Sequence, residues 1–248
     1  MKSKTRWVFF ALSFAAMLVS GCGSIPLLKS TWLDHDLALG PDTKDWPGGL
    51  SAVGDMVSVG TSNNRDWLFL ALVVQDFKNT DDNPPYAHSL AANGLTVWVD
   101  PQGGDHKTFN LSFRGMEGTR SGSANQGKTG GSDDRPDQAL SSDLASNGLT
   151  LTDEKGKSLK TTAQALQAYG FEIRTSYSGG RFIYVMKLPL HPVENSPFPS
   201  GLAKSQAVGF GFEGNDFNVH RSGGGSGGGS GNVTEKFNLW LSVNLASK

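Results

Sequence analysis

Hydrophobic and polar residues alternate in several short stretches of the chain, and this alternation predicts β-strands. At residues 109–113, for example, three apolar side chains are separated by Asn110 and Ser112. Because successive side chains of a strand point to opposite faces, each such strand is predicted to bury one face. The predicted strands span residues 66–74, 94–100, 109–113, 171–177, 181–190, 208–212 and 237–243. The pattern predicts one all-β domain, an antiparallel β-sandwich at residues 32–248.

The stretch from Asp66 to Val74 differs from the others because it is apolar on both faces. Such a strand is typical of the centre of a sheet that is covered on both sides. Trp32, Trp46 and Trp67 are predicted to be core residues.

Three stretches interrupt the strand pattern. Residues 114–157 are rich in Gly, Ser, Asp and Asn, which predicts a surface insertion that continues to residue 170. A short amphipathic helix is predicted at 158–169, where Leu159 and Leu166 belong to an apolar stripe and a glycine follows. The Gly/Ser-rich run at 222–232 is predicted to be a flexible loop, because a strand lies beyond it.

The N-terminus has the three-part pattern of a secretory signal. Lys2, Lys4 and Arg6 precede an apolar segment at 7–19, and small residues follow it before Cys22. The segment is too short for a stable membrane-spanning anchor. A buried helix hairpin is the alternative, but it leaves the three positive charges unexplained.

The run Leu18-Val19-Ser20-Gly21-Cys22 resembles the lipobox of bacterial lipoproteins. The resemblance implies a signal peptide at 1–21, cleavage before Cys22 and a diacylglycerol on its sulfur. Two or three acyl chains give near-permanent anchoring, at roughly 0.8 kcal/mol per buried methylene. Residues 22–31 are then a lipidated tether, and Gly23 favours the outer membrane of the cell envelope.

Composition narrows the functions further. Removal of residues 1–21 leaves 19 Lys and Arg against 23 Asp and Glu, a net charge of about −4. A mildly acidic chain lacks the positive surface that nucleic acid requires. Cys22 is the only cysteine, so once lipidated it leaves no thiol for disulfides, catalysis or zinc.

Six strand motifs follow one another in the order Asp45-Trp46-Pro-Gly, Asp66-Trp-Leu-Phe-Leu, Gly94-Leu-Thr-Val-Trp-Val-Asp100-Pro, Phe182-Ile-Tyr-Val-Met-Lys-Leu-Pro-Leu190, Val208-Gly-Phe-Gly-Phe212 and Phe237-Asn-Leu-Trp240. This order resembles the superfamily of DOMON domains and family 9 carbohydrate-binding modules. The resemblance covers roughly residues 32–245 and is interrupted at 114–170. It implies an antiparallel, jelly-roll-like sandwich that binds sugars, binds haem through a methionine and a histidine, or has no known ligand.

Trp98 and Trp240 are the candidate ligand-binding residues, because each occupies the more polar face of its strand. An outward-facing indole can stack on the apolar face of a sugar ring, and Asp100 and Asn238 can hydrogen-bond its hydroxyls. The alternative is that the helix at 159–169 or the insertion covers both rings.

Other candidate sites have weaker patterns. The run Asp34-His35-Asp36 does not suit one metal ion, because neighbours on a strand point to opposite faces. Asp76, Asp81 and Asp82, or Asp100 with Asp105, match no defined calcium loop. Possible haem ligands, with no spacing that selects a pair, are Met56, Met116, Met186, His88, His106, His191 and His220.

No nucleophile elbow, zinc-protease motif or phosphate loop is present, so we predict a non-catalytic protein without a cofactor. The sequence predicts a membrane-anchored envelope lipoprotein that binds carbohydrate or another envelope ligand. The alternatives are a structural lipoprotein that docks on an envelope protein and a haem-binding domain.

Overall fold

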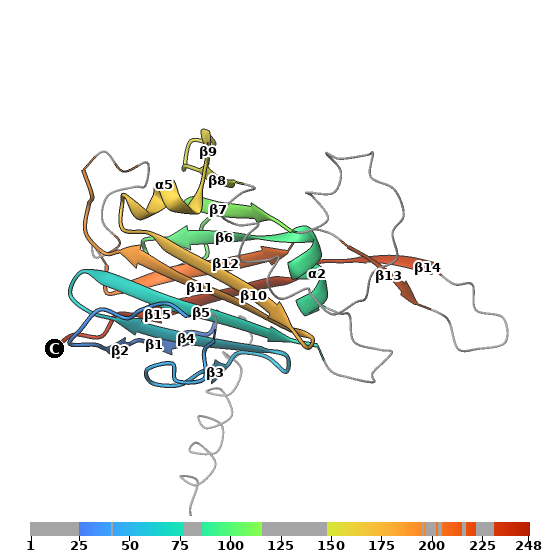
Figure 1. The fold of residues 1–248 in the computed structure, drawn as a ribbon, viewed down its shortest axis with the longest axis horizontal. Coiled ribbons are helices and arrows are strands. Elements are labelled where there is room, and N and C mark those ends of the chain that lie inside the picture. Colours follow the sequence, from blue (N-terminus) through green and yellow to red (C-terminus); the bar gives the residue numbers. More distant parts are fainter. Residues whose placement is uncertain are drawn as a thin grey trace, which may run out of the picture.

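The computed structural model describes residues 25–40, 42–76, 86–115, 148–194, 196, 202, 205–214, 217–221 and 231–248, with the backbone alone at 217–221 and 231–235. This part of the chain is a two-layer β-sandwich with short helices at its ends, as the alternation predicts (Figure 1). Cys22, the centre of the predicted insertion at 116–147 and residues 222–230 lie outside the described residues.

One layer is a seven-stranded sheet with the order β1-β15-β12-β6-β7-β8-β9. Neighbouring strands are antiparallel except at the edge, where β1 runs parallel to β15. The strands are β1 (Leu27–Lys29), β6 (Gly94–Asp100), β7 (Phe109–Arg114), β8 (Leu149–Thr152), β9 (Ser158–Thr161), β12 (Ala207–Gly214) and β15 (Asn238–Asn244).

The second layer is a six-stranded sheet with the order β10-β11-β5-β4-β2, in which β3 also pairs with β4. Only the β2–β4 pair of this sheet is parallel. The strands are β2 (Thr31–Trp32), β3 (Ser51–Ala52), β4 (Val57–Asn63), β5 (Trp67–Gln75), β10 (Glu172–Ser178) and β11 (Arg181–Pro189). A separate ribbon of β13 (Phe217–Arg221) and β14 (Gly231–Glu235) projects from the end of the sandwich near α2 (Figure 1).

The main core lies between the two sheets and is formed by the side chains on one face of each long strand. On β12 the alternation places Val208, Phe210 and Phe212 inside, and all three are fully buried. Leu70 and Leu72 of β5 meet them from the other sheet. Each such side chain contributes roughly 1.5–3 kcal/mol through its removal from water.

The other face of β5 is also buried, which confirms the prediction of a central strand covered on both sides. Phe69 and Val73 point away from the main core and pack under the segment 33–50. Trp46 of this segment is 8% exposed, so it is a core residue as predicted. Its indole lies against Gly60 of β4, where a Cβ would come within 2.5 Å of the ring.

Residues 27–31, predicted as part of the lipidated tether at 22–31, lie along edge strands of both sheets, β1 and β2. The chain passes from β1 in one sheet to β2 in the other at Ser30. Leu28 packs against the main core, and the indole of Trp32 is half-buried and donates to Asp34 at 3.0 Å. These short strands pair with residues far away in the chain, which a local pattern does not reveal.

Residues 149–161, predicted as part of the insertion, form β8 and β9 at the other edge of the seven-stranded sheet. The helix predicted at 158–169 is therefore shorter, because its first turn belongs to β9. It is α5 (Ala163–Gln167), begun by Thr162, whose hydroxyl accepts from the backbone N–H of Ala165. Leu159 is 48% exposed on β9 and is not part of an apolar helix stripe.

The helix α2 (Tyr86–Asn93) closes the opposite end of the sandwich and was not predicted. Its buried Ala87, Leu90 and Ala91 follow the i, i+3, i+4 spacing of one helix face. The Asp76 carboxylate accepts from the backbone N–H groups of Ala87 and His88 at 2.8 and 3.1 Å. No helix within the described ranges has the length and apolarity needed to cross a membrane.

Candidate functional site

Trp98 and Trp240 lie on the outer face of the seven-stranded sheet, the face that points away from the main core. In the register of the sheet Gly211 of β12 is opposite Trp98 on one side and opposite Trp240 on the other. A Cβ at Gly211 would come within 2.5 Å of the Trp240 ring, so the glycine lets this indole lie flat on β12. Both indoles are partly exposed. We call Trp98, Gly211 and Trp240 the aromatic platform.

Glu213 places a carboxylate beside the platform. It accepts the indole N–H of Trp98 at 3.1 Å, and Lys107 and Lys236 lie 2.6 and 3.8 Å from its oxygens. Burial acts to raise the pKa of Glu213, but the hydrogen bonds from Lys107 and Trp98 and the charges of both lysines outweigh it and lower the pKa. The group is therefore ionised at neutral pH and accepts hydrogen bonds.

Lys107 also lies over the Trp98 ring, with its ammonium nitrogen 5.0 Å from the ring centroid. Its side chain is 50% exposed. A ligand that displaces Lys107 from the ring loses a cation–π contact of only about 0.5–1 kcal/mol. The Trp240 ring has no such cation among the described residues.

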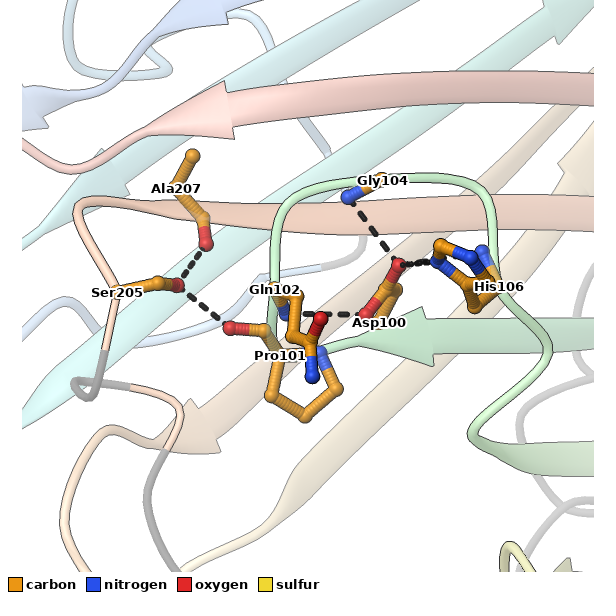
Figure 2. A network of polar contacts seen from close by, with 7 residues as sticks. All are labelled: Asp100, Pro101, Gln102, Gly104, His106, Ser205 and Ala207. Carbon is orange, nitrogen blue, oxygen red and sulfur yellow. Dashed lines mark hydrogen bonds and ion pairs between the residues drawn. The ribbon is translucent and has the colours of Figure 1, made fainter.

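Asp100 is a structural group of the β6–β7 turn rather than an exposed ligand contact. Its carboxylate is 1% exposed and accepts the backbone N–H groups of Gln102, Gly104 and His106 at 2.9–3.1 Å (Figure 2). The Nδ1 of His106 lies 3.0 Å from the same carboxylate, which can only accept, so Nδ1 carries the proton. Ser205 ties the turn to β12 by donating to Pro101 at 2.5 Å.

These contacts explain the charge state of Asp100. Burial acts to raise the pKa of Asp100, but the hydrogen bonds from Gln102 and His106 and the charge of His106 outweigh it and hold the pKa below its usual value of 3.8. The turn folds back over β12, where Gly209 lies against the carbonyl of Gly104. Asp100 thus uses its acceptors within the turn, and a ligand has no access to them.

Asn238 remains available for a ligand. It is exposed at the start of β15 and lies opposite Glu213 in the sheet. The structure therefore brings together three of the four predicted residues, Trp98, Trp240 and Asn238, and assigns Asp100 to the turn.

A row of hydroxyl groups continues from Glu213 across the outer face. Thr96, Ser112 and Thr150 are opposite one another on β6, β7 and β8. The hydroxyls of Thr96 and Ser112 are 2.9 Å apart, and Ser112 donates to Asn110 at 3.2 Å. A hollow of about 380 Å³ lies over this row.

The helix that was one of the two alternative covers for the indoles lies elsewhere in the fold. The helix α5 packs against β10, an edge strand of the other sheet, so it does not cover the two indoles. The same alternative for residues 116–147 lies outside the described residues and stays a prediction.

The described part of the chain contains no cluster of the other candidate metal ligands. No group of three or more His, Cys, Asp or Glu that could hold a metal occurs within the described residues. Met186 is buried in the main core at 1% exposure, whereas His88, His106 and His191 are on the surface. Met116 and the side chain of His220 lie outside the described residues.

Sequence reasoning did not find Glu213, Lys107 and Lys236 as site residues. Each lies far along the chain from at least one partner, so only the strand order brings them together. The one available signal was the position of Glu213 on the polar face of its strand.

No protein-family model and no curated protein matches the chain. Solved structures with some likeness include a family 9 carbohydrate-binding module from Caldicellulosiruptor kristjanssonii. In complex with glucose it is 9% identical with a TM-score of 0.38, and the match covers 90% of this chain and 96% of that one. In complex with cellotriose it is 10% identical with a TM-score of 0.38, and the match covers 90% of this chain and 94% of that one. A protein from Bacteroides uniformis is 9% identical with a TM-score of 0.39, and the match covers 90% of this chain and 100% of that one.

Proposed function

We propose that the protein is a non-catalytic binding module that recognises a saccharide on the aromatic platform. The observation that carries the proposal is the pair of partly exposed indoles, Trp98 and Trp240, on either side of Gly211. The apolar C–H face of a sugar ring can stack on such an indole. A few polar groups that converge beside an aromatic surface are typical of ligand sites.

The polar neighbours of the platform suit the hydroxyl groups of a sugar. Glu213 is ionised and can accept from a sugar hydroxyl, while Lys107 and Asn238 can donate to sugar oxygens. The indoles contribute the contact area, and these groups fix the orientation of the ring.

The test is a glycan array followed by calorimetry with the full chain purified in detergent. We expect Trp98→Ala and Trp240→Ala each to weaken binding by about tenfold, which corresponds to about 1.4 kcal/mol. Trp32→Ala on the opposite sheet is the matched control, and its affinity should equal that of the wild type. Retention of full affinity by both platform variants, or no saccharide binding at all, would sink the proposal.

We also propose that Cys22 is lipidated and anchors the module in the outer membrane, with the pattern of residues 2–22 as its support. Since β1 begins at Leu27, five residues reach at most about 17 Å from the anchor to the sandwich. The module would therefore sit close to the membrane surface.

Labelling of growing cells with radioactive palmitate tests the anchor. Cys22→Ala should abolish the label and leave the precursor uncleaved, whereas Ser24→Ala should be labelled as the wild type. Normal labelling of the Cys22→Ala protein contradicts the proposal. Membrane fractionation then shows whether the labelled protein is in the outer membrane.

A further inference from the structure

The hollow beside the platform has an unusual balance of charge. Two cationic side chains, Arg114 at the end of β7 and Lys160 on β9, line it together with the hydroxyl row. Both are exposed, and neither has an ion pair with a carboxylate among the described residues. None of the described residues that line the hollow is acidic.

Three carboxylates that the structure describes on the seven-stranded sheet and its turns already have partners of their own. Glu213 holds Lys107, Lys236 and the Trp98 indole, and Asp100 is enclosed in its turn. Asp153, in the β8–β9 turn, accepts the backbone N–H groups of two neighbouring residues. The positive charge of the hollow is therefore left without an internal counter-charge within the described structure.

The hollow is also continuous with the platform. Thr96 precedes Trp98 by two residues on the same face of β6, a separation of about 7 Å. Thr96 and Ser112 are opposite each other, and Lys160 ends the same row on β9. Neighbouring units of one saccharide chain can thus occupy both places.

We propose that this hollow binds the anionic group of an acidic sugar, a carboxylate or a sulfate, next to a unit stacked on the platform. This inference rests on the proposed saccharide function and adds the class of saccharide. The guanidinium of Arg114 can bind two oxygens of such a group, and the Lys160 ammonium adds a point charge. The hydroxyls of Thr96, Ser112 and Thr150 hydrogen-bond the remaining oxygens.

The test compares three polymers: polygalacturonate with carboxylates, dextran sulfate with sulfates and neutral dextran. Full-length protein in detergent should bind one acidic polymer at least tenfold more tightly than dextran, and salt should weaken this binding. Arg114→Gln and Lys160→Gln should each reduce affinity for that polymer about tenfold. Lys155→Gln, an exposed lysine of the β8–β9 turn outside the hollow, is the control and should bind as the wild type.

The outcomes separate this inference from the proposed function. Equal binding of dextran and acidic polymers, unaffected by Arg114→Gln and Lys160→Gln, overturns the acidic-sugar site and leaves the platform intact. Acidic binding that depends on Arg114 and Lys160 but not on Trp98 or Trp240 supports the hollow and contradicts the platform. Loss of all saccharide binding overturns both. Because an edge-strand lysine also discourages strand pairing, circular dichroism and the oligomeric state of each variant are measured alongside.

Discussion

The two sheets use the same local contact, a tryptophan on a glycine, for different purposes. Trp46 lies against Gly60 on the six-stranded sheet and is 8% exposed, within an apolar cluster closed by the segment 33–50. Trp240 lies against Gly211 on the seven-stranded sheet and remains partly exposed. The contact itself therefore does not distinguish a buried tryptophan from a partly exposed one.

The surroundings make the distinction. The cluster around Trp46 is made of apolar side chains, including Phe69 and Val73, and its closure removes them from water. On β12, next to Trp240, lies the charged Glu213, and the hydroxyl row begins beyond it at Thr96 of β6. The polar atoms of these groups would be costly to bury without partners. Among the described residues, no apolar segment closes this second face, and both indoles are partly exposed.

The largest expected effect separates the two tryptophans by stability. Trp46→Ala should lower the free energy of unfolding by about 3–5 kcal/mol, because it leaves a cavity in a closed cluster. Trp240→Ala should lower it by only about 1 kcal/mol, because part of the Trp240 side chain is already in contact with water in the folded protein. Urea unfolding followed by far-UV circular dichroism measures both, and equal losses would contradict the comparison.

A second prediction concerns the loss of stability at low pH, to which Asp100 and Glu213 of the seven-stranded sheet contribute. The pKa of Asp100 and that of Glu213 lie below the unfolded values of 3.8 and 4.5, so the unfolded chain takes up protons first as the pH falls. Their contribution to stability is complete above about pH 5 and is lost as the pH falls through the folded pKa values. Asp100→Asn should lower the free energy of unfolding by about 2 kcal/mol at neutral pH, and it should make that free energy less dependent on pH in the acid range.

Unfolding in urea from pH 7 to pH 3 measures this effect. The control is Asp55→Asn at an exposed position, which should unfold as the wild type does at each pH. If the Asp100→Asn protein kept the full acid dependence of the wild type, the turn network would not be its source.

The two glycines give a matched pair with a smaller effect. Gly60→Ala places a Cβ against the enclosed Trp46 ring and should cost about 1–3 kcal/mol by overpacking. Gly211→Ala meets a ring that can swing into solvent, so it should cost less than about 1 kcal/mol while it weakens saccharide binding. Calorimetry and urea unfolding of both variants measure the two effects, and a larger stability loss at Gly211 would reverse the comparison.

The smallest effect is expected inside the main core. Tyr184 is fully buried, and its hydroxyl has no hydrogen-bond partner within the described residues. Burial raises its pKa, so the group stays neutral. Tyr184→Phe removes an unpaired polar atom and should leave stability unchanged or raise it by up to about 1 kcal/mol. A loss of more than that in urea unfolding would indicate a partner for the hydroxyl.

Much of the fold could be predicted because it depends on local pattern. The alternation in β7 and β12, the doubly apolar β5 and the position of Trp98 and Trp240 on the non-core face were all readable from residue order. The short strands β1, β2, β8 and β9 were not, because each is held by pairing with distant residues rather than by its own composition. The helix α2 was missed although its apolar spacing was present.

The sequence by itself determined the all-β class, the central strand, the faces on which the two indoles lie and the lipobox-like run ending at Cys22. These follow from the two-residue period of a strand and from a contiguous motif. Only the tertiary structure decided that Gly211 lies between Trp98 and Trp240, that Glu213 joins them and that Asp100 belongs to its turn. The physical reason is that strand order and register are set by contacts across the whole domain, whereas side-chain alternation is set within each strand.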